Sequence, residues 1–302
     1  MDFSIIIITI LGLAVFEIIT SVDNAVINAD VLRTMSQRGR RFFLTWGLLS
    51  SVFLLRGLLP LIIVWASNPV LGPIGSLTAT FSQDPKVLIA VEATKPILLV
   101  AGGVFLIFLF FHWLFREKKS YGLKGESLLY QHGLWFYTVV SIILAVITWF
   151  GIQRDPLIGF GAVVGSTVYF ITHGFKQNAE EREKKLIHKT GLSDFTKILY
   201  LEVIDATFSI DGVLGAFAFT VSVPLIMIGN GLAAIAVREL TARNINTVKK
   251  YKYLKNGAMY SVFLLGLIMI SYSFGARFPE WVSPIITFIV IGFFFWKSRN
   301  RG

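Results

Sequence analysis

The chain of 302 residues is 55% hydrophobic and only 15% charged, and its mean hydropathy is +0.70. A soluble domain has about 25% charged residues and cannot hide this much apolar surface, so a soluble globular fold is excluded. There is no cysteine, which excludes disulfide frameworks, thiolate metal sites and cysteine nucleophiles.

The apolar runs predict an all-α polytopic membrane protein of about nine transmembrane helices, because about 20 helical residues cross roughly 30 Å of hydrocarbon. The first run contains acids and has no basic segment before it, so we expect a retained helix and not a cleaved signal. Proline-containing breaks such as Asn68-Pro69 and Asp155-Pro156 separate later runs. The expected helices are residues 3–32, 42–66, 87–115, 134–151, 157–174, 196–220, 224–241, 256–274 and 282–296.

Lysine and arginine are distributed unevenly over the connections between these helices. One alternate set of connections, with the C-terminal tail, holds 22 of them, whereas the other set holds only Lys86, Arg154 and Arg277. The positive-inside rule therefore predicts an external N-terminus and a cytoplasmic C-terminus, in the cytoplasmic membrane of a bacterium. The net charge of +10 is an orientation signal, and no nucleic-acid partner is expected.

A short internal repeat relates the first helix to the sixth. In both copies two acids are six residues apart and a serine stands two residues before the second acid: Glu17, Ser21 and Asp23 in one, Asp205, Ser209 and Asp211 in the other. Five helices separate the copies, so they run in opposite directions and predict two inverted three-helix repeats. The predicted organisation is a first repeat (1–115), a middle region with helices four and five (116–195), a second repeat (196–275), and a final helix with a basic tail (276–302).

Further charged residues fall at membrane depth. Arg56 and Arg238 lie equally far from the starts of helices two and seven, and a buried arginine is costly unless an acid neutralises it. Arg56 is expected to be a structural counter-ion or a mobile gate, and Arg238 a counter-ion or an orientation charge at the cytoplasmic rim. Glu202 precedes Asp205 by three residues, so it shares nearly the same helix face and is a candidate extra ligand or proton carrier.

The repeat acids are spaced for a bent helix. On an unbroken helix Glu17, Ser21 and Asn24 share one face and Asp23 points away, so both acids reach one ligand only if the helix bends or unwinds. Ser21 in the first copy and Gly212 in the second suit such a break. Carboxylate, amide, hydroxyl and carbonyl oxygens form a hard ligand set that suits Mn²⁺, Mg²⁺ or Ca²⁺, and the pattern does not choose among them.

At these residues the chain resembles the TerC family of integral membrane proteins, within the lysine-exporter-like transporters. The matching segments include FEIITSVDNAVINADVL, RRFFLTWGLLSSVFLLRGLLP, KPILLVAGGVFLIFLFFHWLF, YLEVIDATFSIDGVLGAFAFT and IGNGLAAIAVREL, which together extend over nearly the whole chain. Gly212 stands where the first copy has Asn24, so one amide is missing from the second copy. The long middle region, residues 116–190, is closer to an uncharacterised branch.

The resemblance implies a transporter of divalent metal ions and not an enzyme. Mn²⁺ efflux is the best-supported activity of that family, and tellurite resistance gives the family its name. No permanently bound cofactor is implied, and the partners are the lipid bilayer, the transported ion and protons as a coupling ion. The acidic motif carries over to the metal ligands Glu17, Asp23, Asn24, Asp205 and Asp211, followed by Asn230 and Arg238 in supporting or gating positions.

Two other classes of function stay open. Asp23 and Asp211 could form the acid/base pair of an intramembrane aspartyl enzyme, although Asp211 follows Phe-Ser-Ile and not Gly-x-Gly. The chain could also be an accessory membrane subunit that delivers metal to another complex. A cationic amino acid is a variant of the transported substrate, since acids would suit it too. Metal binding by the purified protein separates the enzyme from the others, and metal export by the chain expressed alone separates a transporter from a subunit.

Overall fold

The computed structural model describes residues 2–47, 56–79, 84–187, 192–241 and 250–300, and this part of the chain is all-helical, with no strand. Six of its helices are long and apolar enough to cross a membrane: α1 (Phe3–Thr20), α7 (Pro85–Arg116), α9 (Trp135–Arg154), α10 (Pro156–Ile187), α14 (Leu254–Ser273) and α15 (Val282–Asn300). A seventh span exists if α5 (Leu58–Ser67) and the helical segment Pro69–Thr78, bent by 111°, form one broken span. These are the helices of an integral membrane protein.

Two further helices expected to be spans are not among these six. The helix α11 (Asp194–Ala216) carries Glu202, Asp205 and Asp211, and α12 (Val223–Glu239) has only 17 residues. In the described residues, length and composition select six spans, or seven with the broken pair, so the predicted count of nine is not confirmed.

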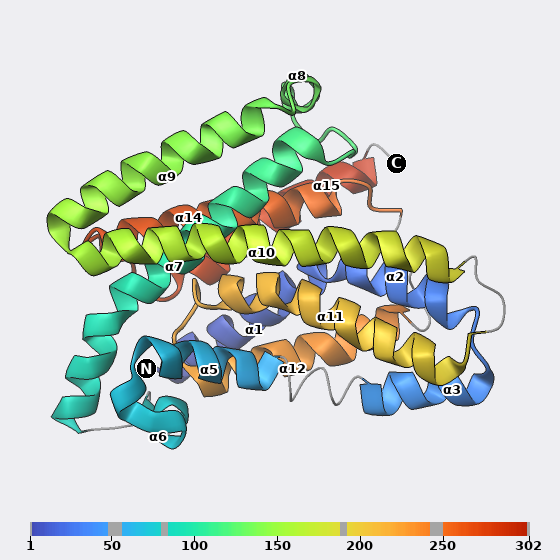
Figure 1. Ribbon diagram of the computed structural model, residues 1–302, viewed down its shortest axis with the longest axis horizontal. Coiled ribbons are helices and arrows are strands. Elements are labelled where there is room, and N and C mark those ends of the chain that lie inside the picture. The colour runs from blue at the N-terminus through green and yellow to red at the C-terminus, as the bar shows by residue number, and fades with distance from the viewer. Residues whose placement is uncertain (1, 48–55, 80–83, 188–191, 242–249, 301–302) are drawn as a thin grey trace.

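The bundle is built around α7, which packs against α10 on one side and α14 on the other, while α1 packs along α12. Figure 1 shows α9 and α10 as an antiparallel pair, with α9 outermost. The α7–α10 contact is close because a Cβ at Gly165 would overlap the carbonyl oxygen of Ala101. Phe105, Trp113 and Tyr169 are fully buried in this core, whereas Trp149 of α9 is 65% exposed and apolar, as expected for a lipid-facing residue.

Local signals explain several helix starts. Pro156 is the first residue of α10, where its missing N–H breaks no hydrogen bond. Ser193 caps α11 by accepting a hydrogen bond from the Thr196 amide at 3.2 Å. Ser36 does the same for the short helix α3 (Gln37–Phe42) through the Gly39 amide.

The expected break in the first helix is confirmed and the break in the second copy is not. The helix predicted at 3–32 is interrupted at Ser21, between α1 and α2 (Val22–Leu32). By contrast α11 continues through Gly212 to Ala216, so the prediction that it bends there is wrong. Gly212 serves close packing instead, because a Cβ at this position would overlap the carboxylate of Glu17.

Other differences concern the ends of helices. The predicted helix 42–66 is seen as the π-helical turn η1 (Phe43–Gly47) and α5, and residues 48–55 lie outside the described part. The connection expected after it contains a 3₁₀ turn η3 (Pro69–Leu71) and α6 (Gly72–Thr78), and the connection after α7 contains α8 (Glu126–Gln131). The helix predicted at 157–174 runs on to Ile187, so the polar run that follows it begins as an extension of α10.

Candidate metal centre

Four buried polar residues from distant parts of the chain meet between α1, α2 and α11. We call Glu17, Asn24, Arg56 and Asp205 the acid cluster; their exposed fractions are 3%, 1%, 3% and 8%. Arg56 Nη1 lies 2.8 Å from Glu17 Oε1, and its Nη2 lies 3.8 Å from Asp205 Oδ1. Ser21 donates a hydrogen bond to Glu17 Oε1 at 2.9 Å. The amide of Asn24 donates to the same oxygen of Asp205 that faces Arg56.

The two copies of the repeat contact each other crosswise at this point. In the aligned repeat Glu17 corresponds to Asp205, and Asn24 corresponds to Gly212. The structure joins Asn24 to Asp205 by a hydrogen bond and seats the Glu17 carboxylate directly against Gly212. Each contact therefore links the acid of one copy to the last motif residue of the other.

The charges of the acid cluster depend on one another. A carboxylate or guanidinium this far from water is costly by itself, and removing one partner of a buried pair typically costs about 3–5 kcal/mol. Arg56 faces both Glu17 and Asp205, so one positive charge is shared between two acids. The expected role of Arg56 as a counter-ion thus agrees with its contacts.

Several buried polar atoms in and around the acid cluster make no hydrogen bond within the described residues. They are Glu17 Oε2, Asn24 Oδ1 and Arg56 Nε in the cluster, and Asn28 Oδ1 four residues after Asn24 on α2. Thr9, Trp113, Ser209 and Asn230 also have buried atoms of this kind. Buried polar groups normally have partners, so this concentration marks a place where water or a bound ion would complete the hydrogen bonds and ligands.

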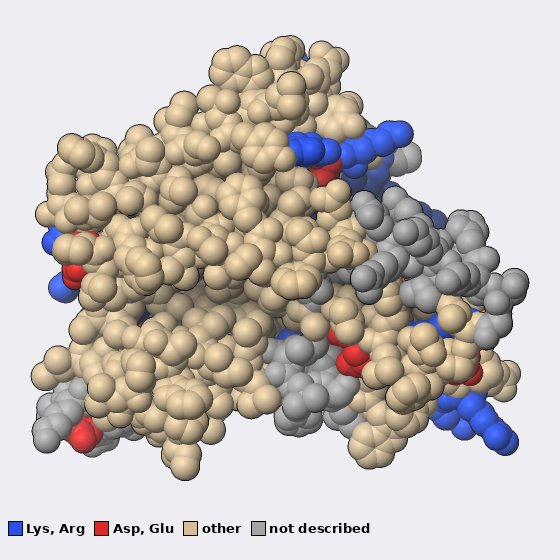
Figure 2. Space-filling view, viewed as in Figure 1, with Lys and Arg blue, Asp and Glu red and all other residues tan. Residues whose placement is uncertain are grey.

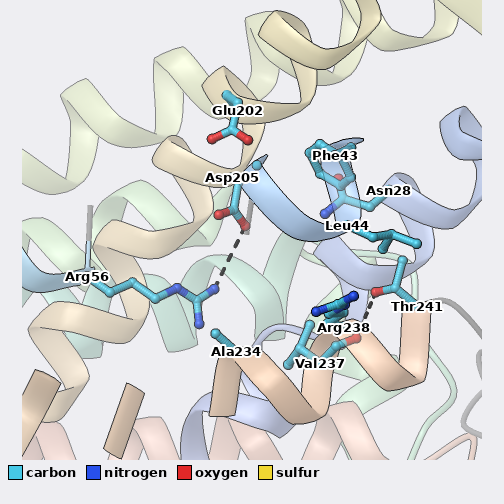
Figure 3. A pocket seen from close by; sticks show the side chains of 11 residues that line it. Asn28, Phe43, Leu44, Arg56, Glu202, Asp205, Ala234, Val237, Arg238 and Thr241 are labelled. Carbon is cyan, nitrogen blue, oxygen red and sulfur yellow. Dashed lines mark hydrogen bonds and ion pairs between the residues drawn. The ribbon is translucent and has the colours of Figure 1, made fainter. Parts of the chain in front are cut away.

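A cavity of about 40 Å³ adjoins the acid cluster. Figure 3 shows Arg56 reaching toward Asp205, with Glu202 one turn earlier on α11 and Arg238 of α12 across the cavity. Asn28 also lines it and was missed in the sequence. Its position was readable, because Asn28 follows Asn24 by four residues and so lies on the face that already carries Glu17 and Ser21.

Asp211 lies apart from the acid cluster, on the other side of α11. Its Oδ2 is 3.7 Å from Nζ of Lys176 on α10, beside a second cavity of about 50 Å³ that Glu117 and Lys255 also line. A step of six residues on a continuous helix turns a side chain by about 240°, so an unbroken α11 points Asp205 and Asp211 in different directions. The side chain of Asp23 lies outside the described residues.

Glu117, just past the end of α7, holds several basic groups at this second cavity. Lys255 donates a hydrogen bond to its Oε2 at 2.6 Å, and His112 Nδ1 lies 3.7 Å from its Oε1. Burial raises the pKa of Glu117, but the nearby His112 and the charges of Lys255 and Lys176 outweigh it and hold the pKa well below its usual range. Glu117 is therefore a carboxylate that stays charged near neutral pH.

Comparison with protein families identifies the chain at the level of a family. Residues 22–302 match the model of the family described as protein of unknown function (DUF475). The chain belongs to this family. The match includes Asn24, Arg56, Asp205 and Asp211 and begins after Glu17. No curated protein and no solved structure matches this DUF475 chain.

In this DUF475 protein the structure brings together part of the set that the sequence singled out. Glu17, Ser21, Asn24, Arg56 and Asp205 are in direct contact, and Glu202 and Arg238 line the adjoining cavity. Ser209 and Asn230 are buried, with exposed fractions of 2% and 1%. Within the described residues, which do not include the side chain of Asp23, no three Asp, Glu or His side chains are grouped closely enough to hold one metal ion.

Proposed function

We propose that this protein transports divalent metal cations across the membrane, with Mn²⁺ efflux as its activity. The observation that carries the proposal is the acid cluster: two buried carboxylates, one from each copy of the repeat, meet with an amide and an arginine inside a bundle of apolar helices. Intramembrane acids are expensive and characteristically line ion pathways. The oxygens of Glu17 and Asn24 that make no hydrogen bond within the described residues are of the kind that Mn²⁺ prefers.

The helix contacts support an arrangement of nine spans in two inverted repeats. A two-fold relation between helices one to three and six to eight would exchange α1 with α11, α5 with α12 and α7 with α14, and the two helices of each pair are in contact. The same exchange turns the contact of α1 with α12 into a contact of α11 with α5, which exists. It also turns the contact of α1 with α14 into a contact of α11 with α7, which exists too. Alternating access would then be a rocking of one repeat against the other around the acid cluster.

The surface charges support the expected orientation. In Figure 2 the blue Lys and Arg atoms gather mainly toward the end of the molecule that holds α3 and the C-terminus, while the surface formed by α9 and by α10 as far as Asn178 is almost uncharged. The positive-inside rule assigns that end to the cytoplasm. An exported ion would enter there, driven by the membrane potential or exchanged for protons on the same carboxylates.

Transport by the purified protein tests the proposal. We expect proteoliposomes containing the wild-type chain to move Mn²⁺, detected with an enclosed metal-sensitive dye, and Asp205→Asn to lower the rate by about tenfold or more, because a metal ligand is lost. The matched control is Asp30→Asn on α2, whose side chain is 41% exposed and forms a local ion pair with the exposed Arg33.

The control should transport at the wild-type rate. Equal rates for Asp205→Asn and the wild type would refute the assignment of the acid cluster. Mn²⁺ binding without transport would favour the accessory subunit, and an excess of lysine that blocks transport would favour an organic cation as substrate.

A further inference from the structure

Lys176 carries a positive charge into the apolar bundle. It lies in the apolar stretch Pro156–Asn178 of α10, and its side chain is only 22% exposed. Its Nζ lies 3.7 Å from Oδ2 of Asp211, whose side chain is 19% exposed. Nothing in the sequence singled out this pair, because the positive charge comes from the middle region and the acid from the second repeat.

The Lys176–Asp211 pair is looser than its neighbour in the same cavity. An ammonium and a carboxylate in a strong charged hydrogen bond are about 2.7–2.9 Å apart. Lys255 and Glu117 are at least this close, at 2.6 Å, whereas Lys176 and Asp211 are 3.7 Å apart. The charge of Lys176 also contributes to the low pKa of Glu117, so its ammonium lies within electrostatic reach of both carboxylates.

The cavity beside this pair has space for a competing ion. Its volume of about 50 Å³ exceeds the roughly 10–15 Å³ that one water needs on the same measure. Thr20 and Val22, on either side of the break at Ser21, line it together with Asp211. The cavity therefore adjoins the motif of the first copy as well as that of the second.

We propose that Lys176 is a tethered cation that occupies the Asp211 carboxylate while no metal ion is bound, and that a divalent cation binds there only when Lys176 moves away toward Glu117. The inference rests on the proposed function and extends it. When a transporter has released its ion, an unpaired carboxylate inside the membrane would be costly. A lysine on a neighbouring helix can supply the positive charge that the ion provided. Its long aliphatic stem allows the ammonium to move between two acids without moving α10.

Mn²⁺ affinity measures this competition. Using the full chain in detergent and the electron paramagnetic resonance signal of free Mn²⁺, we expect Lys176→Gln to bind Mn²⁺ about tenfold more tightly, since the competing state is removed. Lys176→Arg keeps the charge and should bind like the wild type. The matched control is Lys124→Gln, which removes one positive charge from an exposed lysine that does not line the cavity and should leave the affinity unchanged.

The wild-type protein provides a second test that does not depend on the stability of any variant. Mn²⁺ should accelerate acylation of Lys176 by an amine-reactive reagent, measured by mass spectrometry against the exposed Lys124, outside the cavity, as the internal reference. An unchanged Mn²⁺ affinity in Lys176→Gln, or unchanged acylation of Lys176 in a wild-type protein that does bind Mn²⁺, would refute the role of Lys176. Either result would leave the proposed transport function standing. Absence of Mn²⁺ binding to the wild type would refute the proposed function together with it.

Discussion

Gly212 of the second copy lies directly against the Glu17 carboxylate of the first. It replaces the asparagine of the first copy, and the Glu17 carboxylate occupies the space that any side chain would need. The loss of one amide from the second copy therefore has a steric consequence. Position 212 cannot carry a side chain while the Glu17 carboxylate stays where it is.

This exclusion predicts the effect of the smallest substitution. Gly212→Ala should displace the Glu17 carboxylate from Arg56, reduce Mn²⁺ transport by about tenfold or more, and destabilise the fold by about 1–3 kcal/mol, the usual cost of overpacking a core. The measurements are the proteoliposome rate and the thermal unfolding midpoint in detergent.

A second glycine of the same bundle is the control. A Cβ at Gly174 in α10 meets no atom within 4 Å, so Gly174→Ala should leave transport intact and raise helix stability by up to about 1 kcal/mol. If Gly212→Ala behaved like Gly174→Ala, the close contact between Glu17 and position 212 would be absent from the working protein.

At the scale of elements, the start of α11 is fastened to the segment before α3. Asp194 accepts hydrogen bonds from the Ser36 hydroxyl and from its amide, the latter at 3.3 Å, and Lys197 donates to the Thr34 carbonyl oxygen at 2.8 Å. These bonds connect the segment after α2, in the first repeat, to the start of α11, the first helix of the second repeat. The connection is exposed, so it can be tested separately from the acid cluster.

The hydrogen bonds from Ser36 lower the pKa of Asp194 below its ordinary value of 3.8. A lowered native pKa means that the carboxylate contributes stability above pH 3.8, and that this contribution is lost as the pH falls through the lower native value. We expect Asp194→Ala to unfold at lower denaturant than the wild type at pH 7, and the difference to shrink below pH 3.8. Tryptophan fluorescence during unfolding measures both midpoints.

Asp30→Ala is the reference for this comparison, because Asp30 is an exposed acid whose bond to Arg33 is local and weak. Its midpoint should stay close to that of the wild type at both pH values. A difference for Asp194→Ala that does not change with pH would mean that the charge of Asp194 does not contribute.

Helical periodicity predicted which residues share one face of a helix. It could not predict which other helix packs against that face. The contacts of Glu17, Asn24 and Asp205 follow from the repeat, and Asn28 was readable from the same spacing. The break at Gly212 was predicted from the freedom of glycine, but this glycine permits close packing, a property of the neighbouring helix. The partner of Asp211 was missed because the helix predicted at 157–174 ended before Lys176, whereas α10 runs through it.

At the scale of the whole molecule, α10 and α15 hold comparable positions. The helix α10 packs against α7 and α11, and α15 packs against α14 and α1, the partners that the proposed two-fold relation would exchange. The two helices differ in chemistry, since α10 brings Lys176 to Asp211 while Thr287 and Ile291 are among the residues that α15 buries. The middle region thus gives the second repeat a charge partner, Lys176. In the described residues no ion pair joins α15 to the first repeat in the same way.

The lack of native cysteine makes the nine-span arrangement directly testable with single-cysteine variants. If α11 and α12 cross the membrane and the N-terminus is external, cysteines at Asp155, Thr220 and Arg277 should react with an impermeant maleimide added to intact cells. Cysteines at Ser193 and Lys252 should react only after the membrane is opened. Thr220 decides the point, because it lies between α11 and α12 and lines a cavity of about 500 Å³ that this arrangement would place on the external side. Labelling of Ser193 and protection of Thr220 in intact cells would reverse the direction of α11 and remove the inverted relation between the repeats.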